Sequence, residues 1–303
     1  MTEFAYLERN CPACGAASTK PEVQSQLAAE LLPFSDLRSH WSGLFKEKVF
    51  FSYERCAACG LLYAPTYFTP DQLEILYADM APNMELVTST ALEATQRGYW
   101  DATKRHADLT GDYLEIGPDI GYIAGHAARE GQFDHFWLFE PNRSVHQELS
   151  NAVRGHPHDI SVLMGDLSMV KDDSVGLAVM VHVLDHVLDP VTTLQQVWRK
   201  LKPGGTLMIV THNEKSLLRT FMAKRWPPFC LQHPEIYNPA SMRRMVARAG
   251  YSSVKVQRSR NYFPISFIAK QAAFTFGFDI KGAMLPKTAI GLKLGNIITF
   301  ARR

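Results

Sequence analysis

The chain has 303 residues, of which 46% are hydrophobic and 20% are charged, the balance of a globular protein with a substantial core. Its net charge of +2 at pH 7 excludes the strongly basic character of a dedicated polyanion binder. No apolar run reaches the ~18 residues of a membrane-spanning helix, and residues 1–10 lack the apolar stretch of a signal peptide. We therefore expect a cytoplasmic protein without a membrane span.

The N-terminal segment carries a repeated cysteine motif. Two Cys-x-x-Cys-Gly turns supply four of the five cysteines, namely Cys11, Cys14, Cys56 and Cys59. Four thiolates suit structural Zn²⁺ in a closed tetrahedral site, and the glycine after each pair permits the tight turn. A redox dithiol is the alternative, which the duplication disfavours. We predict a zinc-ribbon-like domain over residues 1–68, with Lys20–Lys48 looping out between the two turns.

A helical segment follows. Thr69-Pro70-Asp71 is typical of a helix start, with threonine as N-cap and proline at the first helical position. This helix would present Leu73, Leu76 and Tyr77 on one side. We predict a helical linker or lid over residues 69–111, close to the entrance of an active site in the next domain.

Residues 112–303 alternate short apolar runs with helical stretches, a pattern that predicts an α/β domain with a doubly wound, mainly parallel sheet. The expected strands are Tyr113–Gly117, Phe136–Glu140, Ile160–Met164, Gly176–Val181 and Thr206–Thr211. The expected helices between them are Tyr122–Arg129, Arg143–Val153 and Val191–Leu201. Ligands of such sheets bind at the carboxyl ends of the strands.

The distal part begins with a stiff, proline-rich loop over Lys224–Pro228. A helix is expected at Pro239–Ala249 and strands at Ser253–Gln257 and Asn296–Arg302. Pro264–Phe276 is amphipathic with a broad apolar face, which we interpret as core or homodimer contact rather than a membrane anchor.

Several residues at the predicted strand ends point to a nucleoside ligand. Gly117 and Gly121 form a strand-to-helix turn where the backbone can approach a ligand. Glu140, about 20 residues further on, suits bidentate hydrogen bonding to ribose hydroxyls, and Asp166 can accept a hydrogen bond from an adenine amino group. Each also has a plainer interpretation, as an ordinary turn or a solvated acid.

Together with Val181–His186, Asp189-Pro190 and Leu201–Gly205, this pattern resembles the class I S-adenosylmethionine-dependent methyltransferase superfamily. The resemblance implies a seven-stranded Rossmann-like sheet whose last strand is antiparallel, and S-adenosylmethionine as cofactor. Gly117 and Gly121 would then line its methionine part, Leu167 would stack beside the adenine, and His182 would face the sulfonium or the substrate. The implied cofactor-binding set is Glu115, Gly117, Asp119, Gly121, Glu140, Pro141, Asp166, Leu167 and His182.

One position departs from the family pattern. Asp119 stands where the family usually has glycine, and aspartate tolerates unusual backbone angles better than most residues. If the turn fails, the protein is a catalytically degenerate binding module rather than an enzyme. A dehydrogenase is disfavoured, because the turn lacks the second glycine of Gly-x-Gly-x-x-Gly.

The cysteine motifs joined to this domain resemble zinc-ribbon methyltransferases that act on small molecules and sugars. The resemblance implies methyl transfer to a hydroxyl, less readily to a carbon, of a sugar, polysaccharide precursor or secondary metabolite. RNA methylation is the alternative that the low charge disfavours. We expect a small-molecule substrate and no nucleic-acid partner.

A hydroxyl acceptor calls for a base near neutral pH, which favours histidine. Of eleven histidines, His182 and His233 are our candidates for the catalytic base, and His186 is expected to cap or pack. The spacing of His182 and His186 could hold a metal, but the sequence shows no convincing third ligand.

Overall fold

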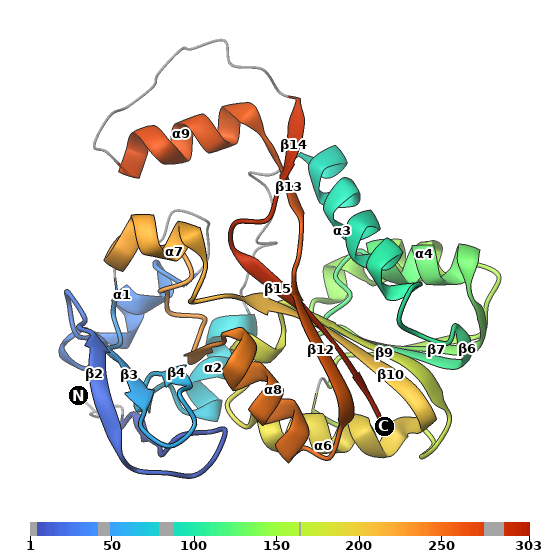
Figure 1. Cartoon of the computed structure of the whole chain (residues 1–303), viewed down its shortest axis with the longest axis horizontal. Helices are drawn as coiled ribbons and strands as arrows, with labels where there is room; N and C mark the ends of the chain where they lie inside the picture. The colour runs from blue at the N-terminus through green and yellow to red at the C-terminus, as the bar shows by residue number, and fades with distance from the viewer. Residues whose placement is uncertain (1–4, 42–48, 79–87, 164, 276–287) are drawn as a thin grey trace.

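The computed structural model describes residues 5–41, 49–78, 88–163, 165–275 and 288–303. A large twisted sheet with helices on both faces lies beside a smaller unit built from the N-terminal residues (Figure 1). Among the described residues, none of the helices has the length and apolar character needed to cross a bilayer.

The central sheet has seven strands in the order β12-β15-β10-β9-β6-β7-β8. Their bounds are Thr110–Ile116 (β6), Gln132–Phe139 (β7), His158–Ser161 (β8), Val175–Val181 (β9), Leu201–His212 (β10), Ser252–Arg258 (β12) and Asn296–Arg302 (β15). Strand β15 is antiparallel to both β10 and β12, whereas the pairs from β10 to β8 are parallel. The predicted sheet is therefore confirmed, including the antiparallel last strand. Its third strand ends at Ser161, earlier than expected.

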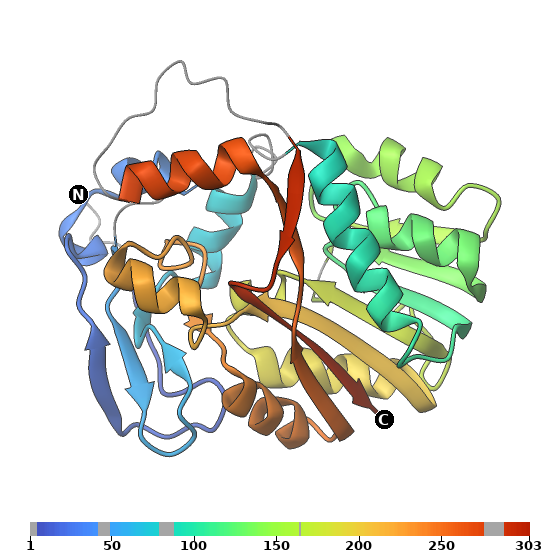
Figure 2. The same ribbon diagram turned by 45° about the horizontal axis from the view of Figure 1, so that its top comes forward.

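Helices cover both faces of this sheet, because side chains alternate along each strand. On one face, Tyr113 packs in a cluster with residues of α3 (Ser89–Thr103), α4 (Tyr122–Glu130) and α5 (His146–Ala152). On the other face, Leu114 and Ile116 pack with residues of α6 (Pro190–Lys200) and α8 (Pro239–Arg248). Figure 2 shows α3 and α4 together on the first face. Helix α5 follows a short 3₁₀ turn, η2 (Arg143–Val145).

The N-terminal unit is a four-stranded sheet in the order β11-β4-β3-β2 with an aromatic core. Its strands are Thr19–Val23 (β2), Tyr53–Cys56 (β3), Leu62–Tyr63 (β4) and Glu235–Ile236 (β11), and β1 (Leu7–Glu8) pairs with β5 (Thr66–Tyr67). The expectation that Lys20–Lys48 loops out was wrong: β2 pairs with β3, and the segment continues through η1 (Ala29–Leu31) and α1 (Phe34–Arg38). Buried Val23, Leu37 and Trp41 make it part of a core. Residues 42–48 lie outside the described part.

The unit closes with α2 (Pro70–Ala78) and its predicted cap. The Gln72 N–H approaches Thr69 Oγ1 at 3.3 Å, and the Thr69 N–H donates to Gln72 Oε1 at 2.8 Å. This reciprocal pair is a capping box. Leu73 and Leu76 of α2 enter the aromatic core, whereas α3, in the same predicted linker, packs against α4.

The two units are joined through the C-terminal half of the chain. Strand β11 lies between β10 and α8 in the sequence and adds to the N-terminal sheet by pairing with β4. Arg9 Nη2 donates to Glu235 Oε2 at 2.6 Å, with both side chains buried (8% and 0% exposed). The N-terminal unit is therefore fixed against the large sheet by a strand pair and a buried ion pair.

The remaining elements lie near the carboxyl end of β10. They are α7 (Leu217–Met222), η4 (Ala223–Arg225), the hairpin β13 (Asn261–Pro264) and β14 (Ala289–Leu292), and α9 (Ile265–Thr275). A turn of helix at Ala223–Arg225 replaces the first part of the loop predicted over Lys224–Pro228. Figure 2 shows α9 on the same side of the molecule as α7.

Candidate active site

The four motif cysteines converge on one centre. Their Sγ atoms all lie within 4.8 Å of one another, with 3.5 Å separating both Cys11 from Cys59 and Cys14 from Cys56. A zinc tetrahedron with bonds of about 2.3 Å has edges of about 3.8 Å, so the spacing fits that ion. Both turns use the same backbone geometry: Gly15 and Gly60 have φ of 75° and 76°. The arrangement fits a zinc ribbon, as the motifs predict.

The loop after β6 is bent through three left-handed residues. Gly117, Asp119 and Gly121 have φ of 69°, 52° and 85°. Asp119 thus adopts the backbone conformation that usually selects glycine and keeps the turn intact. At Gly121 a Cβ would lie 2.7 Å from Leu149 Cδ1, so this glycine is required for the contact between α4 and α5.

Glu140, directly after β7, ties this loop to the next one. Its Oε2 accepts the N–H of Asp119 and its Oε1 accepts the N–H of Asn142, each at 2.9 Å. The side chain is 7% exposed, and burial raises its pKa although the two N–H donors oppose the shift. Each carboxylate oxygen has a second lone pair. Glu140 can therefore accept two further hydrogen bonds without losing those that shape the loops.

The other predicted cofactor-binding residues differ in how buried they are. Glu115 is 2% exposed and accepts the hydroxyl of Tyr113 at 2.6 Å, and burial raises its pKa to about 8. It therefore lies inside the sheet layer rather than on a surface. Pro141 and Asp166 are exposed, and Asp166 Oδ1 accepts the N–H of Ser168 at 2.9 Å. Leu167 is 4% exposed and belongs to the core below α6.

A histidine cluster lies beyond the carboxyl ends of β9 and β10. We define the histidine cluster as His182, Asp185, His186, His212 and His233. His182 follows β9, Asp185 and His186 lie in the 3₁₀ turn η3 (Leu184–His186), His212 ends β10, and His233 precedes β11. The ring centroids of His182 and His212 are 4.7 Å apart, and that of His233 is 4.9 Å from His212 and 4.7 Å from His186.

Asp185 is the buried centre of this cluster. It is 0% exposed, and its Oδ2 lies 3.9 Å from both His182 Nδ1 and His212 Nε2. Burial opposes ionisation, but the neighbouring histidines outweigh it and hold the pKa of Asp185 well below its usual range. Burial lowers the pKa of His212, and the nearby His182 lowers it further. A carboxylate beside neutral imidazole is the expected state at neutral pH.

The two predicted base candidates differ in their surroundings. The His182 side chain is 30% exposed, and its Nε2 contacts Asn296 Nδ2 at 3.1 Å. His233 is 6% exposed, with Nδ1 2.7 Å from Pro228 O and 3.3 Å from Cys230 Sγ. Burial alone would lower the pKa of His233, but Cys230 and Asp185 raise it to about 9. His233 thus holds its proton at neutral pH, whereas His182 is the more accessible ring.

Sequence reasoning missed Asp185 and Asn296 as members of this site, and it named no partner for Tyr77. Tyr77 Oη lies 3.1 Å from His186 Nδ1, so the N-terminal unit reaches the histidine cluster. The only available sequence signal for Asp185 was its place three residues after His182. The histidine spacing noted in the sequence paired His182 with His186, whereas the structure groups His182 with Asp185 and His212 at metal-ligand spacing.

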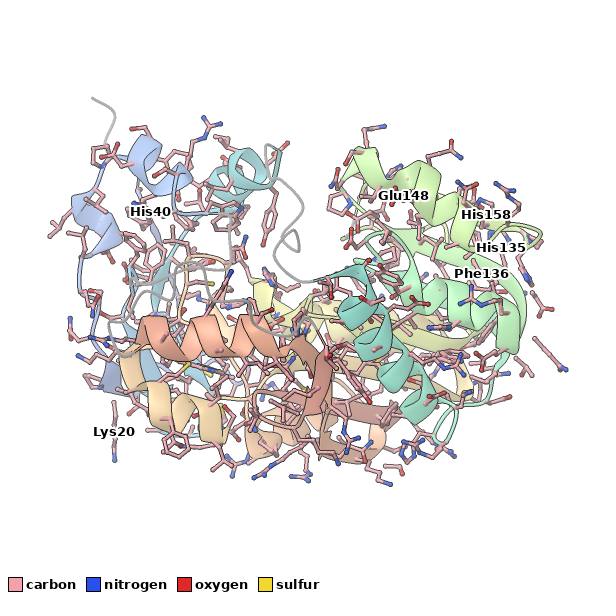
Figure 3. The ribbon with its side chains drawn as sticks, turned by 90° about the horizontal axis from the view of Figure 1, so that it is seen from above. Lys20, His40, His135, Phe136, Glu148 and His158 are labelled. Carbon is pink, nitrogen blue, oxygen red and sulfur yellow. The ribbon has the colours of Figure 1, made fainter. Side chains whose placement is uncertain are left out.

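Most other histidines lie away from this cluster. Figure 3 shows His135 and His158 at the far side of the large sheet and His40 in the N-terminal unit. His135 Nε2 lies 3.0 Å from Asp159 Oδ2 near the start of β7. His146 also lies outside the histidine cluster, but it contacts a predicted cofactor residue. Its Nε2 lies 2.8 Å from Glu140 O and so supports the loop that carries Glu140.

The strand order, the left-handed glycine loop and the acid at the end of β7 define a class I methyltransferase fold. The sequence model of a methyltransferase-domain family matches residues 91–256, more than half of the chain. The chain therefore belongs to this family, and the protein is an S-adenosylmethionine-dependent methyltransferase. No curated protein matches the chain in sequence.

Solved structures of methyltransferases are similar to this chain at low sequence identity. An S-adenosylmethionine-dependent methyltransferase from Thermotoga maritima is 17% identical, with 70% of this chain and 90% of that chain covered and a TM-score of 0.47. One from Mesorhizobium loti is 15% identical, with 68% and 98% covered and a TM-score of 0.45. Likenesses at this level carry no information about the methyl acceptor.

Proposed function

We propose that the protein transfers a methyl group from S-adenosylmethionine to a hydroxyl oxygen of a small, uncharged acceptor, such as a sugar, a polysaccharide precursor or a secondary metabolite. The observation that carries this proposal is the histidine cluster around Asp185, at the strand ends where class I folds bind their substrates. Its imidazole groups, together with the Asn296 amide and the Tyr77 hydroxyl beside them, can form hydrogen bonds with the hydroxyls of such an acceptor.

The strand-end residues suit the cofactor. Glu140 would accept both ribose hydroxyls on the lone pairs that its loop contacts leave free. The backbone of Gly117 and Asp119 would line the methionine part, with Asp166 at the adenine. The bound cofactor supplies a methyl group already activated by the sulfonium, so the protein mainly aligns the acceptor and takes up a proton.

We assign proton uptake to His182. An Asn296 amide hydrogen pointing at Nε2 leaves that nitrogen unprotonated and the ring proton on Nδ1, toward Asp185. The acceptor hydroxyl would replace Asn296 at Nε2 and deliver its proton there, while the Asp185 carboxylate stabilises the resulting imidazolium. His233, protonated and buried, would add positive charge and hold the cluster in place.

The N-terminal unit completes the site in this proposal. Zn²⁺ held by Cys11, Cys14, Cys56 and Cys59 would be structural, since four thiolates leave no open position. The ion would stabilise the unit that brings Tyr77 to His186. We propose residues 1–68 as this zinc-ribbon-like domain and residues 69–111 as the segment that connects it to the methyltransferase domain.

The test supplies the protein with trideuteromethyl-labelled S-adenosylmethionine and either the small-metabolite fraction or the total RNA of the source cells. We expect a CD₃ ether in the small-molecule fraction, detected by mass spectrometry. His182→Gln should abolish most of this label, and His135→Gln, a histidine at the far side of the sheet, should retain it (Figure 3).

Two results would contradict the proposal. Label found only in RNA would identify a nucleic-acid methyltransferase. A protein that neither transfers label nor binds S-adenosylhomocysteine in calorimetry would be a binding module that has lost its activity.

A further inference from the structure

Three members of the histidine cluster also have the spacing of metal ligands. His182, Asp185 and His212 each offer one ligand atom, and these atoms lie within 4.8 Å of one another. Asp185 Oδ2 is 3.9 Å from His182 Nδ1 and 3.9 Å from His212 Nε2. We call these three residues the metal triad. Strands β9 and β10 are hydrogen-bonded neighbours in the sheet, which fixes the triad on a rigid support (Figure 1).

Two atoms of the metal triad, one on Asp185 and one on His182, lack hydrogen-bond partners among the described residues. Asp185 is completely buried, and its Oδ1 has no hydrogen-bond partner among the described residues. His182 Nδ1 is also buried without a partner. A buried carboxylate is costly unless it is hydrogen-bonded or faces a cation. Asp185 Oδ2 accepts the backbone N–H of His212 at 3.3 Å, whereas Oδ1 is left without a donor among the described residues. A bound cation would satisfy that oxygen.

The outer atoms of both rings are held by one residue. Asn296 Oδ1 lies 3.1 Å from His212 Nδ1, and Asn296 Nδ2 lies 3.1 Å from His182 Nε2. These contacts turn His212 Nε2 and His182 Nδ1 inward, toward Asp185. Outer contacts of this kind orient the histidines of metal sites. His182 is also held by its backbone, with φ of 52° and its N–H donating to Val210 O at 2.9 Å.

We infer that His182, Asp185 and His212 bind a divalent transition-metal ion that leaves coordination positions open to the methyl acceptor. Two imidazole nitrogens and one carboxylate suit ions such as Zn²⁺, Fe²⁺, Co²⁺ or Mn²⁺. Bonds of about 2.0–2.2 Å bring ligand atoms to about 3.0–3.5 Å from one another, so small side-chain rotations would close the observed 3.9 Å. Three protein ligands leave room for a further oxygen.

The ion would change how the acceptor loses its proton. A hydroxyl bound to a divalent ion has a lowered pKa and would release its proton to a water molecule without a strong base. With the ion bound, His182 would be a ligand through Nδ1 with its own proton on Nε2, and would no longer be the base. The role of the ion in removing the acceptor's proton rests on the proposed function, whereas binding of the ion does not.

Substitutions of Asn296 test whether the triad binds a metal ion. Whichever way its amide is turned, it offers one acceptor and one donor, so it can accept a hydrogen bond from only one of the two rings. A metal-loaded triad has an N–H on both outer nitrogens. Asn296→Asp, which accepts from both rings, should therefore tighten metal binding, and Asn296→Leu should weaken it by about 10- to 100-fold.

The direct test measures metal binding without cofactor or substrate, so its failure is distinguishable from failure of the proposed function. The full-length protein is treated with a mild chelator and titrated with Co²⁺, and total zinc and cobalt per chain are measured. Thiolate ligands give cobalt an intense charge-transfer absorption, whereas imidazole and carboxylate give only weak ligand-field bands. We expect one equivalent of metal bound by the cysteine sulfurs and a second equivalent of Co²⁺ that gives weak ligand-field bands alone.

Variants locate the second equivalent. Asp185→Asn and His212→Gln should lose it while keeping the sulfur-bound one, which also reports that the N-terminal unit is folded. His186→Gln, in the same cluster but outside the triad, should keep both. The inference is overturned if the wild type binds only the sulfur-bound equivalent, or if Asp185→Asn and His212→Gln bind the second one as tightly as the wild type.

Discussion

Glu140 offers the sharpest perturbation of the cofactor site. The change Glu140→Gln replaces one carboxylate oxygen by an amide NH₂, which then faces the N–H of Asp119 or of Asn142. One buried backbone donor loses its acceptor, which costs about 1–3 kcal/mol of folding free energy. The cofactor loses one charge-assisted contact to ribose, worth about 1.5–3 kcal/mol. At 1.4 kcal/mol per tenfold, affinity should fall by roughly 10- to 100-fold.

Calorimetry with S-adenosylhomocysteine measures this affinity, and urea denaturation measures the stability separately. The matched control is Glu74→Gln, the same substitution on the exposed side of α2, which should change neither quantity. If folded Glu140→Gln binds S-adenosylhomocysteine as tightly as the wild type, the assignment of Glu140 to the ribose is refuted.

Three further predictions concern the rest of the structure. Cys56→Ser should lose one equivalent of zinc and lower the melting temperature by several degrees, because the metal stabilises the N-terminal unit; unchanged zinc content would contradict the site. Arg9→Met leaves the Glu235 carboxylate buried without its cation and should cost about 3–5 kcal/mol in denaturant unfolding, much of which Arg9→Met with Glu235→Leu should restore. Glu115 has a folded-state pKa of about 8, above that of the unfolded chain, so folding binds a proton and stability falls as pH rises from the unfolded value toward 8. Glu115→Gln should therefore gain stability relative to the wild type at pH 8 but not at pH 5, as measured by urea denaturation at both pH values; equal differences at both would show that Glu115 titrates normally.

The elements that the sequence predicts well are those with strong local signals. Asn296–Arg302 matches β15 over its whole length, and the helix expected from Pro239 is capped by the Asn238 side chain, which accepts from the Ala240 and Ser241 N–H groups. Periodicity and caps act over a few residues, so they can be read without knowing what packs around them. Asp119 also belongs here, since its left-handed φ is what the glycine pattern requires at that position.

Elements that depend on distant partners could not be predicted in this way. Thr19–Val23 contains Lys20, Pro21 and Glu22, residues that disfavour a strand, and becomes one because β3 pairs with it. Helix α7 leaves Leu217 and Phe221 exposed, so it has no amphipathic pattern to detect. Strand β11 is two residues long and exists only because β4 offers it an edge.

The residues of the candidate site also differ in whether local sequence predicts their positions. The glycine loop and Glu140 follow one strand each, so their positions relative to the sheet follow from local sequence. The two histidines of the metal triad and their partner Asn296 come from three strands. His182 follows β9, His212 ends β10, and the register of β10 with β15 places Asn296 opposite His212. A strand register with a partner 84 positions away is invisible to motif analysis.

The most direct test of the account is a crystal structure of the protein with S-adenosylhomocysteine. We predict both ribose hydroxyls within hydrogen-bond distance of the Glu140 carboxylate and the cofactor sulfur facing the histidine cluster from the ends of β6 and β9. A nucleoside bound elsewhere, or a sulfur atom directed away from His182, would contradict it.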